Sequence, residues 1–135
     1  MFLDPLLDAT HDRLAILNSR DGAVLASMLE PAFDSKTRRK GLLGRTRLED
    51  GCAVILAPCN SVHTFFMRFP IDVVFATKTG VVVKIVHELA AWRLCASLRA
   101  FATIELAAGS AARAGLRVGD RLTVAPHGPA PFRVS

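Results

Sequence analysis

The chain has 135 residues, of which 51% are hydrophobic and 21% charged, and its formal net charge at pH 7 is +5. This length and composition suit one globular domain with a core of its own, which excludes a disordered protein and a disulfide-dependent scaffold. Three cysteines without a Cys-x-x-Cys pair, no signal peptide and no apolar run of ~20 residues predict a cytoplasmic protein without a membrane span.

The N-terminal part of the chain predicts an arm followed by a hairpin. Residues 1–12 show no clear apolar period and are expected to form the arm. Residues 13–18 and 23–29 are apolar runs that flank an Asp-Gly turn at 19–22. Asp-Gly between two such runs is typical of a β-hairpin. Pro31 is expected to end its second strand.

A short basic helix is predicted next. Asp34 or Ser35 can cap its start, and the helix is expected to run to about Leu43 with Gly44 at its end. Residues 36–47 carry six of the 17 basic residues and no acidic residue, whereas the rest of the chain has 11 basic and 12 acidic residues. The basic character therefore belongs to this segment, either as a solvated face or as a contact for an anionic partner.

The remaining chain is dominated by short apolar and β-branched runs, which predict strands at residues 52–57, 62–69, 71–75, 81–86, 101–106 and 121–124. Residues 87–100 lack a clean period and are interpreted as a loop that carries Trp92. An Ala-rich stretch at 107–114 predicts a short helix capped by Ser110. Residues 126–135 hold three Pro and a Gly and are expected to form a tail.

This pattern of elements predicts a mainly β fold. Six or seven short strands at this spacing, with two short helices, favour an antiparallel β-sandwich or a partly open barrel. The spacing leaves little room for helical crossovers, so most strand pairs should be antiparallel. The single β-rich domain is expected to span residues 13–125.

The most unusual stretch is 62–75, which combines four of the eight Phe residues with a few isolated polar side chains. In a strand that breaks at Pro70, Arg68 and Asp72 would lie in one neighbourhood. They could line a ligand pocket with an aromatic wall, or form a structural ion pair at a strand bend. The candidate ligand-binding residues of this stretch are His63, Thr64, Met67, Arg68 and Asp72.

Several motifs occur in a fixed order: Gly-Leu-Leu-Gly-Arg at 41–45, His-Thr-Phe-Phe-Met-Arg-Phe-Pro-Ile-Asp-Val-Val-Phe at 63–75, Glu-Leu at 105–106 and Gly-Asp at 119–120. Over about residues 36–124 this order resembles domain-of-unknown-function family 192. The family usually has Met at the position of Leu43 and often Trp-Met where this chain has Phe66-Met67. The resemblance implies a compact, mainly β domain, and it implies no established reaction, cofactor or catalytic residue.

Other combinations of residues carry less specific signals. Cys59 and His63 are four residues apart, but a turn and a strand need not align a thiol with an imidazole. The remaining His and Cys residues do not supply the three or four ligands of a metal site. The basic segment lacks interleaved aromatic residues, which argues against nucleic-acid binding. Glu105, an acid in an apolar strand, is a further site candidate, as are Arg39 and Arg45 if the basic helix packs over the site.

The sequence therefore favours a small domain that binds a polar or anionic small ligand or a partner protein, and it assigns no catalytic residue, cofactor or metal. One alternative is a hydrolase-type enzyme that uses His63 or Asp72 as general base, which would require a titrating group in a cleft. The other is an assembly or scaffold protein, which would expose a contiguous apolar patch.

Overall fold

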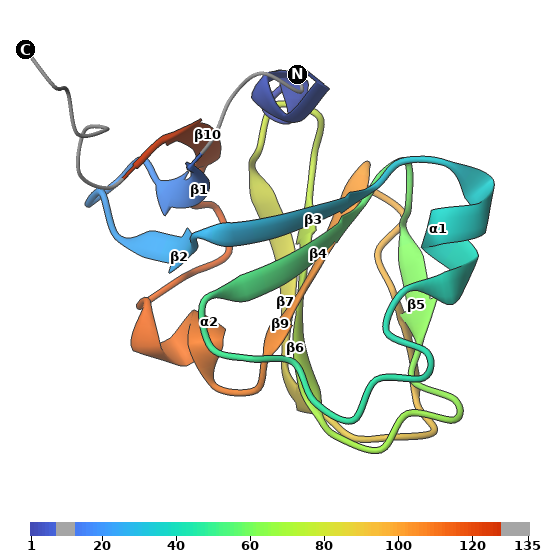
Figure 1. The fold of residues 1–135 in the computed structure, drawn as a ribbon. Helices are drawn as coiled ribbons and strands as arrows, with labels where there is room; N and C mark the ends of the chain where they lie inside the picture. Colours follow the sequence, from blue (N-terminus) through green and yellow to red (C-terminus); the bar gives the residue numbers. More distant parts are fainter. Residues whose placement is uncertain (8–12, 128–135) are drawn as a thin grey trace, which may run out of the picture.

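Strands dominate the structure, a computed structural model that describes residues 1–7 and 13–127 (Figure 1). The three sheets have the strand orders β10-β1-β2, β3-β4-β9-β6-β7 and β5-β8. The first sheet contains β1 (Leu14–Asn18), β2 (Val24–Ala26) and β10 (Leu122–Pro126). The second contains β3 (Met28–Ala32), β4 (Cys52–Leu56), β6 (Ile71–Ala76), β7 (Val82–Leu89) and β9 (Ala102–Ala107). The third is a ribbon of β5 (Ser61–His63) and β8 (Leu94–Ala96).

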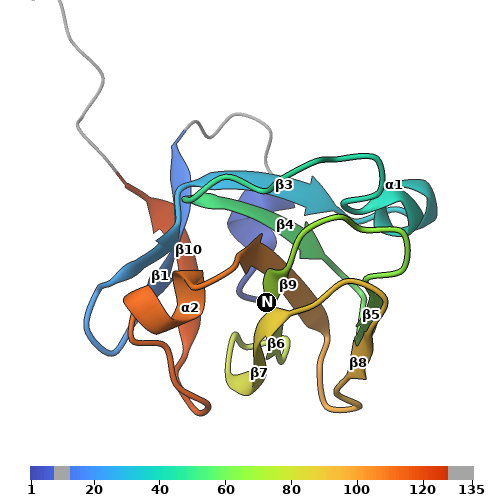
Figure 2. The same cartoon turned by 90° about the horizontal axis from the view of Figure 1, so that it is seen from below.

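The helices are short: α1 (Ser35–Lys40), α2 (Ser110–Arg113) and a 3₁₀ turn, η1 (Asp4–Leu7). The predicted fold class, mainly β with sandwich-like or open-barrel sheets and two short α-helices, is confirmed. Figure 2 shows α1 and the β5–β8 ribbon at one end, with β1, β10 and α2 at the other. Within the described residues, no helix has the length and apolar character needed to cross a membrane.

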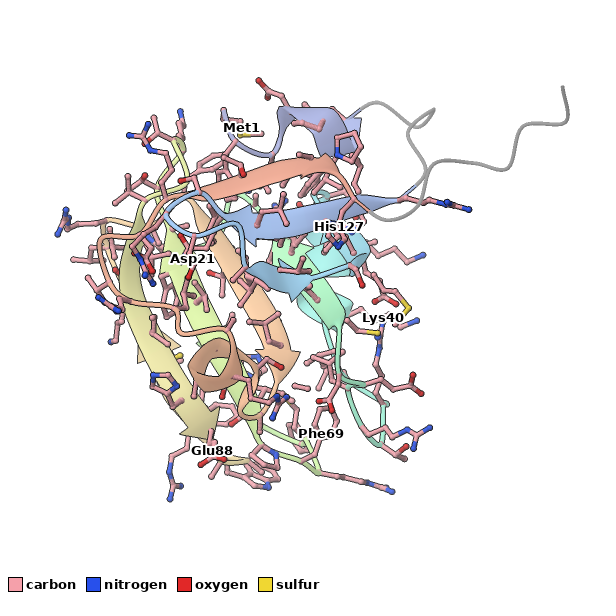
Figure 3. All side chains as sticks on the ribbon, turned by 90° about the vertical axis from the view of Figure 1, so that its left-hand side faces the viewer. Met1, Asp21, Lys40, Phe69, Glu88 and His127 are labelled. Atoms are coloured by element: carbon pink, nitrogen blue, oxygen red, sulfur yellow. The ribbon has the colours of Figure 1, made fainter. Side chains whose placement is uncertain are left out.

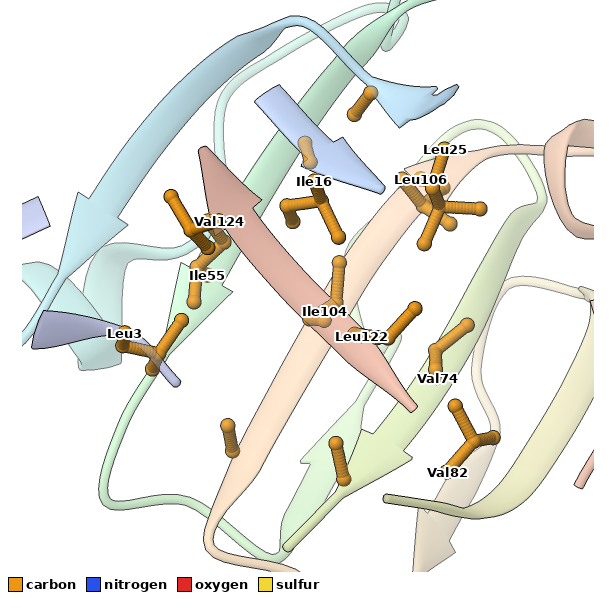
Figure 4. Close-up of a cluster of buried hydrophobic side chains, with 14 of the residues drawn as sticks. Leu3, Ile16, Leu25, Ile55, Val74, Val82, Ile104, Leu106, Leu122 and Val124 are labelled. Atoms are coloured by element: carbon orange, nitrogen blue, oxygen red, sulfur yellow. The ribbon is translucent and has the colours of Figure 1, made fainter. Parts of the chain in front are cut away.

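The five-stranded sheet has apolar side chains on both faces, because its central strands are covered on each side. One face packs against the three-stranded sheet and η1. Ile55 and Ile104 on this face belong to the same buried cluster as Ile16 and Leu122 of the three-stranded sheet (Figure 4). The alternate residues of the same strands point the other way. On that second face, a separate cluster is covered by the segments around α1 and β5; it includes Val54, Leu56, Val73, Phe75, Leu42, Val62 and Met67.

The strand pairing follows the prediction with one exception. Among the described strands, only β3 and β4 pair in parallel. Residues 33–51, which include α1, form the crossover that a parallel pair requires. Pro31 does not end a strand as predicted but lies inside β3, which is tolerated because β3 is the edge of its sheet. The predicted hairpin is present as the antiparallel pair β1 and β2.

The central stretch and the loop after it differ from the prediction. Residues 62–69 are not one strand: β5 ends at His63, and a turn-rich loop leads to β6 at Ile71. The segment 87–100 is not only a loop, since β7 continues to Leu89 and β8 follows. Local apolar patterns missed β8 because a three-residue strand in a two-stranded ribbon is too short to show a period.

The helix ends and the N-terminal segment also differ. Helix α1 ends at Lys40, and Gly41 rather than Gly44 follows it, with φ 45° and ψ −122°. Helix α2 begins at Ser110 without a side-chain cap, after a left-handed Gly109. In the predicted N-terminal arm, Leu3 is fully buried in the cluster between the five-stranded and three-stranded sheets. The rest of that arm, 8–12, and most of the predicted tail, 128–135, lie outside the described residues.

Candidate functional site

A cavity of about 380 Å³ opens on the second face of the five-stranded sheet. Its sides are α1 with the turn after it and β5, and its floor is formed by β4 and β9. Figure 1 shows how these elements are arranged. This volume lies within the roughly 300–1,000 Å³ of small-molecule sites in proteins. The side chains that matter most for its chemistry are those of Arg38, Arg39, Lys40, His63, Met67 and Glu105.

Glu105 is the acidic group of this pocket. It lies in the middle of β9, level with Val54 on β4 and Val73 on β6, so strand alternation points it into the second apolar cluster. Only 5% of the residue is exposed. Within the described part of the chain its carboxylate forms no hydrogen bond or ion pair. A Cβ placed on Gly41 would be 3.7 Å from Oε1, so the turn after α1 passes close to this carboxylate.

The surroundings change the proton affinity of Glu105. Burial raises the pKa of this carboxyl from its ordinary value of 4.5 to about 7, although the charge of Arg45 acts in the opposite direction. Loss of hydration disfavours the charged form in such a position. Near neutral pH the group can therefore either donate or accept a hydrogen bond at the floor of the pocket.

The rim of the pocket is basic. Arg38 is held in place, because Nη1 donates to the carbonyl oxygens of Phe33 at 2.6 Å and Ala57 at 3.4 Å. Arg39 and Lys40 are exposed and have no hydrogen bond or ion pair to side chains in the described residues. Lys40 is labelled in Figure 3, which is viewed from the side opposite α1. Two cations are thus available above a buried acid.

Arg45, another predicted candidate, does not line this pocket. It forms an ion pair with Glu30 on β3 and contributes to two neighbouring hollows. Its effect on the pocket is electrostatic, through the pKa of Glu105. The basic segment therefore divides its charges between a salt bridge on the sheet edge and the rim of the pocket.

The opposite wall contains His63 and Cys59. The imidazole of His63 stacks on Phe65, with ring centroids 4.9 Å apart and an angle of 27° between the planes. The Cys59 thiol donates to the backbone carbonyl of Ser61 at 3.1 Å. Both side chains line the pocket, but within the described residues no hydrogen bond joins them. Nor does any group of three His, Cys, Asp or Glu side chains there have the arrangement of a metal site.

Asp72 lies outside the pocket, on the other face of the sheet. Its Oδ1 accepts a hydrogen bond from the backbone N–H of Glu88 at 2.8 Å, and Oδ2 accepts one from that of Ala111 at 2.9 Å. The carboxylate thereby fastens the end of β7 and the start of α2 to β6. Arg68 is exposed, and no ion pair joins it to Asp72 or to another described residue.

Thr64 and Met67 have different positions in the loop after β5. Met67 is buried and lines the pocket. Thr64 is fully buried and does not line it; the hydroxyl donates to the carbonyl of Ala90 at 2.6 Å and accepts from the N–H of Arg93 at 2.8 Å. Its main chain also bonds to Arg93 and Trp92. Thr64 thus joins the loop after β5 to the loop before β8.

The pocket therefore brings together four of the eight candidate residues: Arg39, His63, Met67 and Glu105. The candidate set did not contain Lys40 or Ser61, which also line it. Lys40 could have been included from the sequence, because Lys36, Arg39 and Lys40 are spaced to lie along one side of the predicted helix. Nothing in the sequence indicates that Ser61 lines a pocket, because this depends on how β5 lies relative to α1.

Comparisons with known proteins agree on the fold. A crystal structure of a protein of unknown function from Novosphingobium aromaticivorans is similar, with a TM-score of 0.70, 23% identity and 82% of each chain covered. A crystal structure described as a "putative transcription regulator" from Sinorhizobium meliloti has a TM-score of 0.72 and 21% identity, covering 83% of this chain and 92% of that one. Comparison with curated proteins finds no match. The model of domain-of-unknown-function family 192, "Uncharacterized ACR", matches residues 16–124, and the chain belongs to this family.

Proposed function

We propose that the domain binds a small polar ligand in the pocket above Glu105. The observation that carries this proposal is the position of Glu105: the residue is only 5% exposed, lines the pocket, and has no hydrogen bond or ion pair in the described residues. No side-chain oxygen that is fully closed off from solvent lacks a partner in the described residues, so the Glu105 carboxylate keeps its contact with the pocket and is open to a ligand. A ligand that places a hydroxyl, ammonium or amide donor at the pocket floor would supply the missing bond.

The rim defines the second half of the ligand. Arg39 offers a planar fork of donors that matches a carboxylate or a phosphate, and Lys40 adds a second positive charge. The ligand class is therefore a small molecule with a donor at one end and an anionic group at the other, such as an amino acid, a hydroxy acid or a sugar phosphate. Met67 and Leu56 supply apolar contact between the two ends.

The hydrolase alternative has weaker support. His63 lines the pocket, but Asp72 lies across the sheet with both oxygens bonded to backbone N–H groups. A nucleophile with an adjacent base is the usual arrangement for covalent hydrolysis. The Cys59 thiol instead donates to a carbonyl oxygen. Binding without chemistry therefore accounts for more of the geometry.

The test is a thermal-shift screen with amino acids, hydroxy acids, sugar phosphates and inorganic phosphate. A ligand at 100 times its Kd stabilises by about 2.7 kcal/mol, which corresponds to roughly 5 °C or more for a domain of this size. We expect such a shift with a compound that has both a donor and an anionic group. Glu105→Leu and Arg39→Ala should each abolish it.

Arg121→Ala is the matched control, because it removes one exposed arginine beside β10, on the other sheet. The shift should persist in this variant. If no compound stabilises the native chain, or if the shift survives in both Glu105→Leu and Arg39→Ala, the proposal is wrong.

A further inference from the structure

An exposed aromatic surface adjoins the pocket and shares His63 with it. We call it the aromatic patch; its members are His63, Phe65, Phe66, Trp92 and Leu94. Phe66 is 71% exposed, Leu94 68% and Trp92 55%, which is unusual for side chains of this size. The patch comes from β5 and the loop after it and from β8 and the loop before it. These two segments run side by side in Figure 1.

The members of the aromatic patch touch one another in a continuous series. His63 is the register partner of Leu94 in the β5–β8 ribbon and stacks on Phe65. Phe65 in turn stacks on Trp92 at 6.0 Å between centroids, and Phe66 meets Trp92 at 4.6 Å with the rings tilted by 59°. The exposed apolar groups therefore form one surface with a defined shape rather than scattered single residues.

The backbone is strained in order to present this surface. Phe66 has φ 65° and Trp92 has φ 63°, a left-handed conformation that bulky residues rarely adopt. Thr64 fixes both loops: its carbonyl oxygen accepts from the N–H of Trp92 at 2.9 Å and from that of Met67 at 3.2 Å. Backbone strain at exposed aromatic residues, maintained here by hydrogen bonds to the fully buried Thr64, is typical of a preorganised binding surface.

The charged side chains within the two segments that form the aromatic patch are all basic, although the exposed Glu88 directly precedes the second segment. Residues 61–71 and 89–101 contain Arg68, Arg93 and Arg99 and no acidic residue. The three arginine side chains are exposed, and none forms an ion pair with a described residue. Aromatic side chains and arginine together are the residues most enriched at the energetic centres of protein–protein interfaces.

We propose that the aromatic patch is a docking site for a partner protein with a segment of acidic and apolar residues. The apolar side chains of that segment would cover Phe66, Trp92 and Leu94, while its carboxylates would pair with the arginines at the edge. A membrane surface fits less well. Binding to anionic lipid needs clustered positive charge but no defined ring geometry, whereas these rings contact one another in series on a strained backbone.

Trp92 provides a direct reporter, because it is the only tryptophan of the chain. Random dodecapeptides displayed on phage would be selected on the native protein, with counter-selection on the double variant Phe66→Ala/Trp92→Ala. We expect the enriched peptides to combine Asp or Glu with Leu, Phe or Trp. Synthetic copies should change the Trp92 emission on binding. Phe66→Ala and Arg68→Glu should each weaken binding by about tenfold or more.

Three controls keep the test decisive. Arg121→Glu makes the same charge change as Arg68→Glu at a distant site and should alter affinity less than about twofold. Arg39→Ala, at the rim of the pocket, should leave peptide binding intact, which separates this proposal from small-ligand binding. Circular dichroism confirms that each variant is folded.

The following outcomes would overturn the proposal. One is that selection yields no peptide that distinguishes the native chain from the double variant. Another is that the enriched peptides are basic or uncharged. A third is that phosphatidylserine vesicles, rather than any peptide, shift the Trp92 emission to shorter wavelength, which would assign the aromatic patch to a membrane surface. Self-association at high concentration that depends on Phe66 would assign it to a second copy of the chain.

Discussion

Asp72 and Glu105 are two buried carboxylic acids on neighbouring strands of one sheet, and their surroundings are opposite. In the register of β6 and β9, Asp72 lies beside Leu106 and Glu105 beside Val73, so the two acids are one position apart and point to opposite faces. Both oxygens of Asp72 accept backbone N–H groups, whereas Glu105 has no partner in the described residues. Burial alone therefore does not mark a site. The useful distinction is whether the protein itself satisfies the buried charge.

The largest effect that separates the two acids is expected from Asp72→Ala. This change leaves the N–H groups of Glu88 and Ala111 without their acceptor, and each lost bond to a charged group is worth about 1.5–3 kcal/mol. We therefore expect the free energy of unfolding to fall by about 4 kcal/mol in urea denaturation. Thr103→Val, which removes one neutral side-chain hydrogen bond to the carbonyl of Cys59 from the same sheet, should cost only about 1 kcal/mol. Similar losses in the two variants would contradict a special role for Asp72.

Glu105 should instead make stability depend on pH near neutrality. Its pKa is 4.5 ordinarily and about 7 in the folded protein, so between these values the folded state holds a proton that the unfolded chain has released. The contribution of Glu105 to the free energy of unfolding should therefore be largest below about pH 4.5 and fall as the pH rises to about 7, by about 3 kcal/mol at most. Above about pH 7 the stabilisation from the protonated Glu105 is fully lost, and the ionisation of this group should no longer change the free energy of unfolding.

The matched variant for this pH effect is Glu105→Gln, which keeps the shape of the side chain but cannot ionise. Urea denaturation between pH 4.5 and 8 should show a nearly flat profile for Glu105→Gln and a falling one for the native chain. Equal slopes in the two proteins would mean that Glu105 titrates near its ordinary pKa, and the contrast with Asp72 would then be lost.

The fold could largely be predicted from the sequence, because its strands depend on local signals. The Asp-Gly turn between β1 and β2 and the β-branched run of β7 are examples. The parallel pairing of β3 with β4 could not be predicted, since no local pattern says that the chain crosses over through α1. The broken geometry at Phe66 also escaped prediction, because hydrogen bonds from Thr64 to residues near 92 impose it from outside the segment.

The site could be predicted only in part, for a related reason. Glu105 was found as an acid in an apolar strand, and Arg39 as a member of a basic helix that was expected to pack over the site. Asp72 drew attention on the same ground as Glu105, yet it serves two backbone N–H groups from β7 and α2, partners that are 16 and 39 residues away in the chain. Sequence shows which polar residue must be buried, but not which distant groups satisfy it.

A smaller effect is expected from Gly41→Ala, beside Glu105. The ψ of −122° together with the positive φ lies outside the region open to side-chain-bearing residues. Strain of this kind costs about 1–3 kcal/mol, and we expect a loss in this range by urea denaturation. Gly41→Asn should be no better than Gly41→Ala, because Asn tolerates only the left-handed helical region. Recovery of stability with Asn would show that the turn over Glu105 relaxes easily.

The smallest effect concerns Asp120, an acid whose carboxylate is satisfied mainly by side chains. Hydrogen bonding from Arg20, at 2.9 Å, lowers the pKa of Asp120 from 3.8 to about 2, with further bonds from Arg117 N–H and Asn18. Its stabilisation is therefore present above pH 3.8 and lost as the pH falls through about 2, the reverse of the effect of Glu105.

Arg20→Ala should move the acid-unfolding midpoint, followed by circular dichroism, to higher pH. Because Arg20 is partly exposed, added salt should reduce the difference between the variant and the native chain. If the midpoint does not move, Asn18 and the N–H of Arg117 suffice to hold the charge, and Asp120 then resembles Asp72 rather than a surface ion pair.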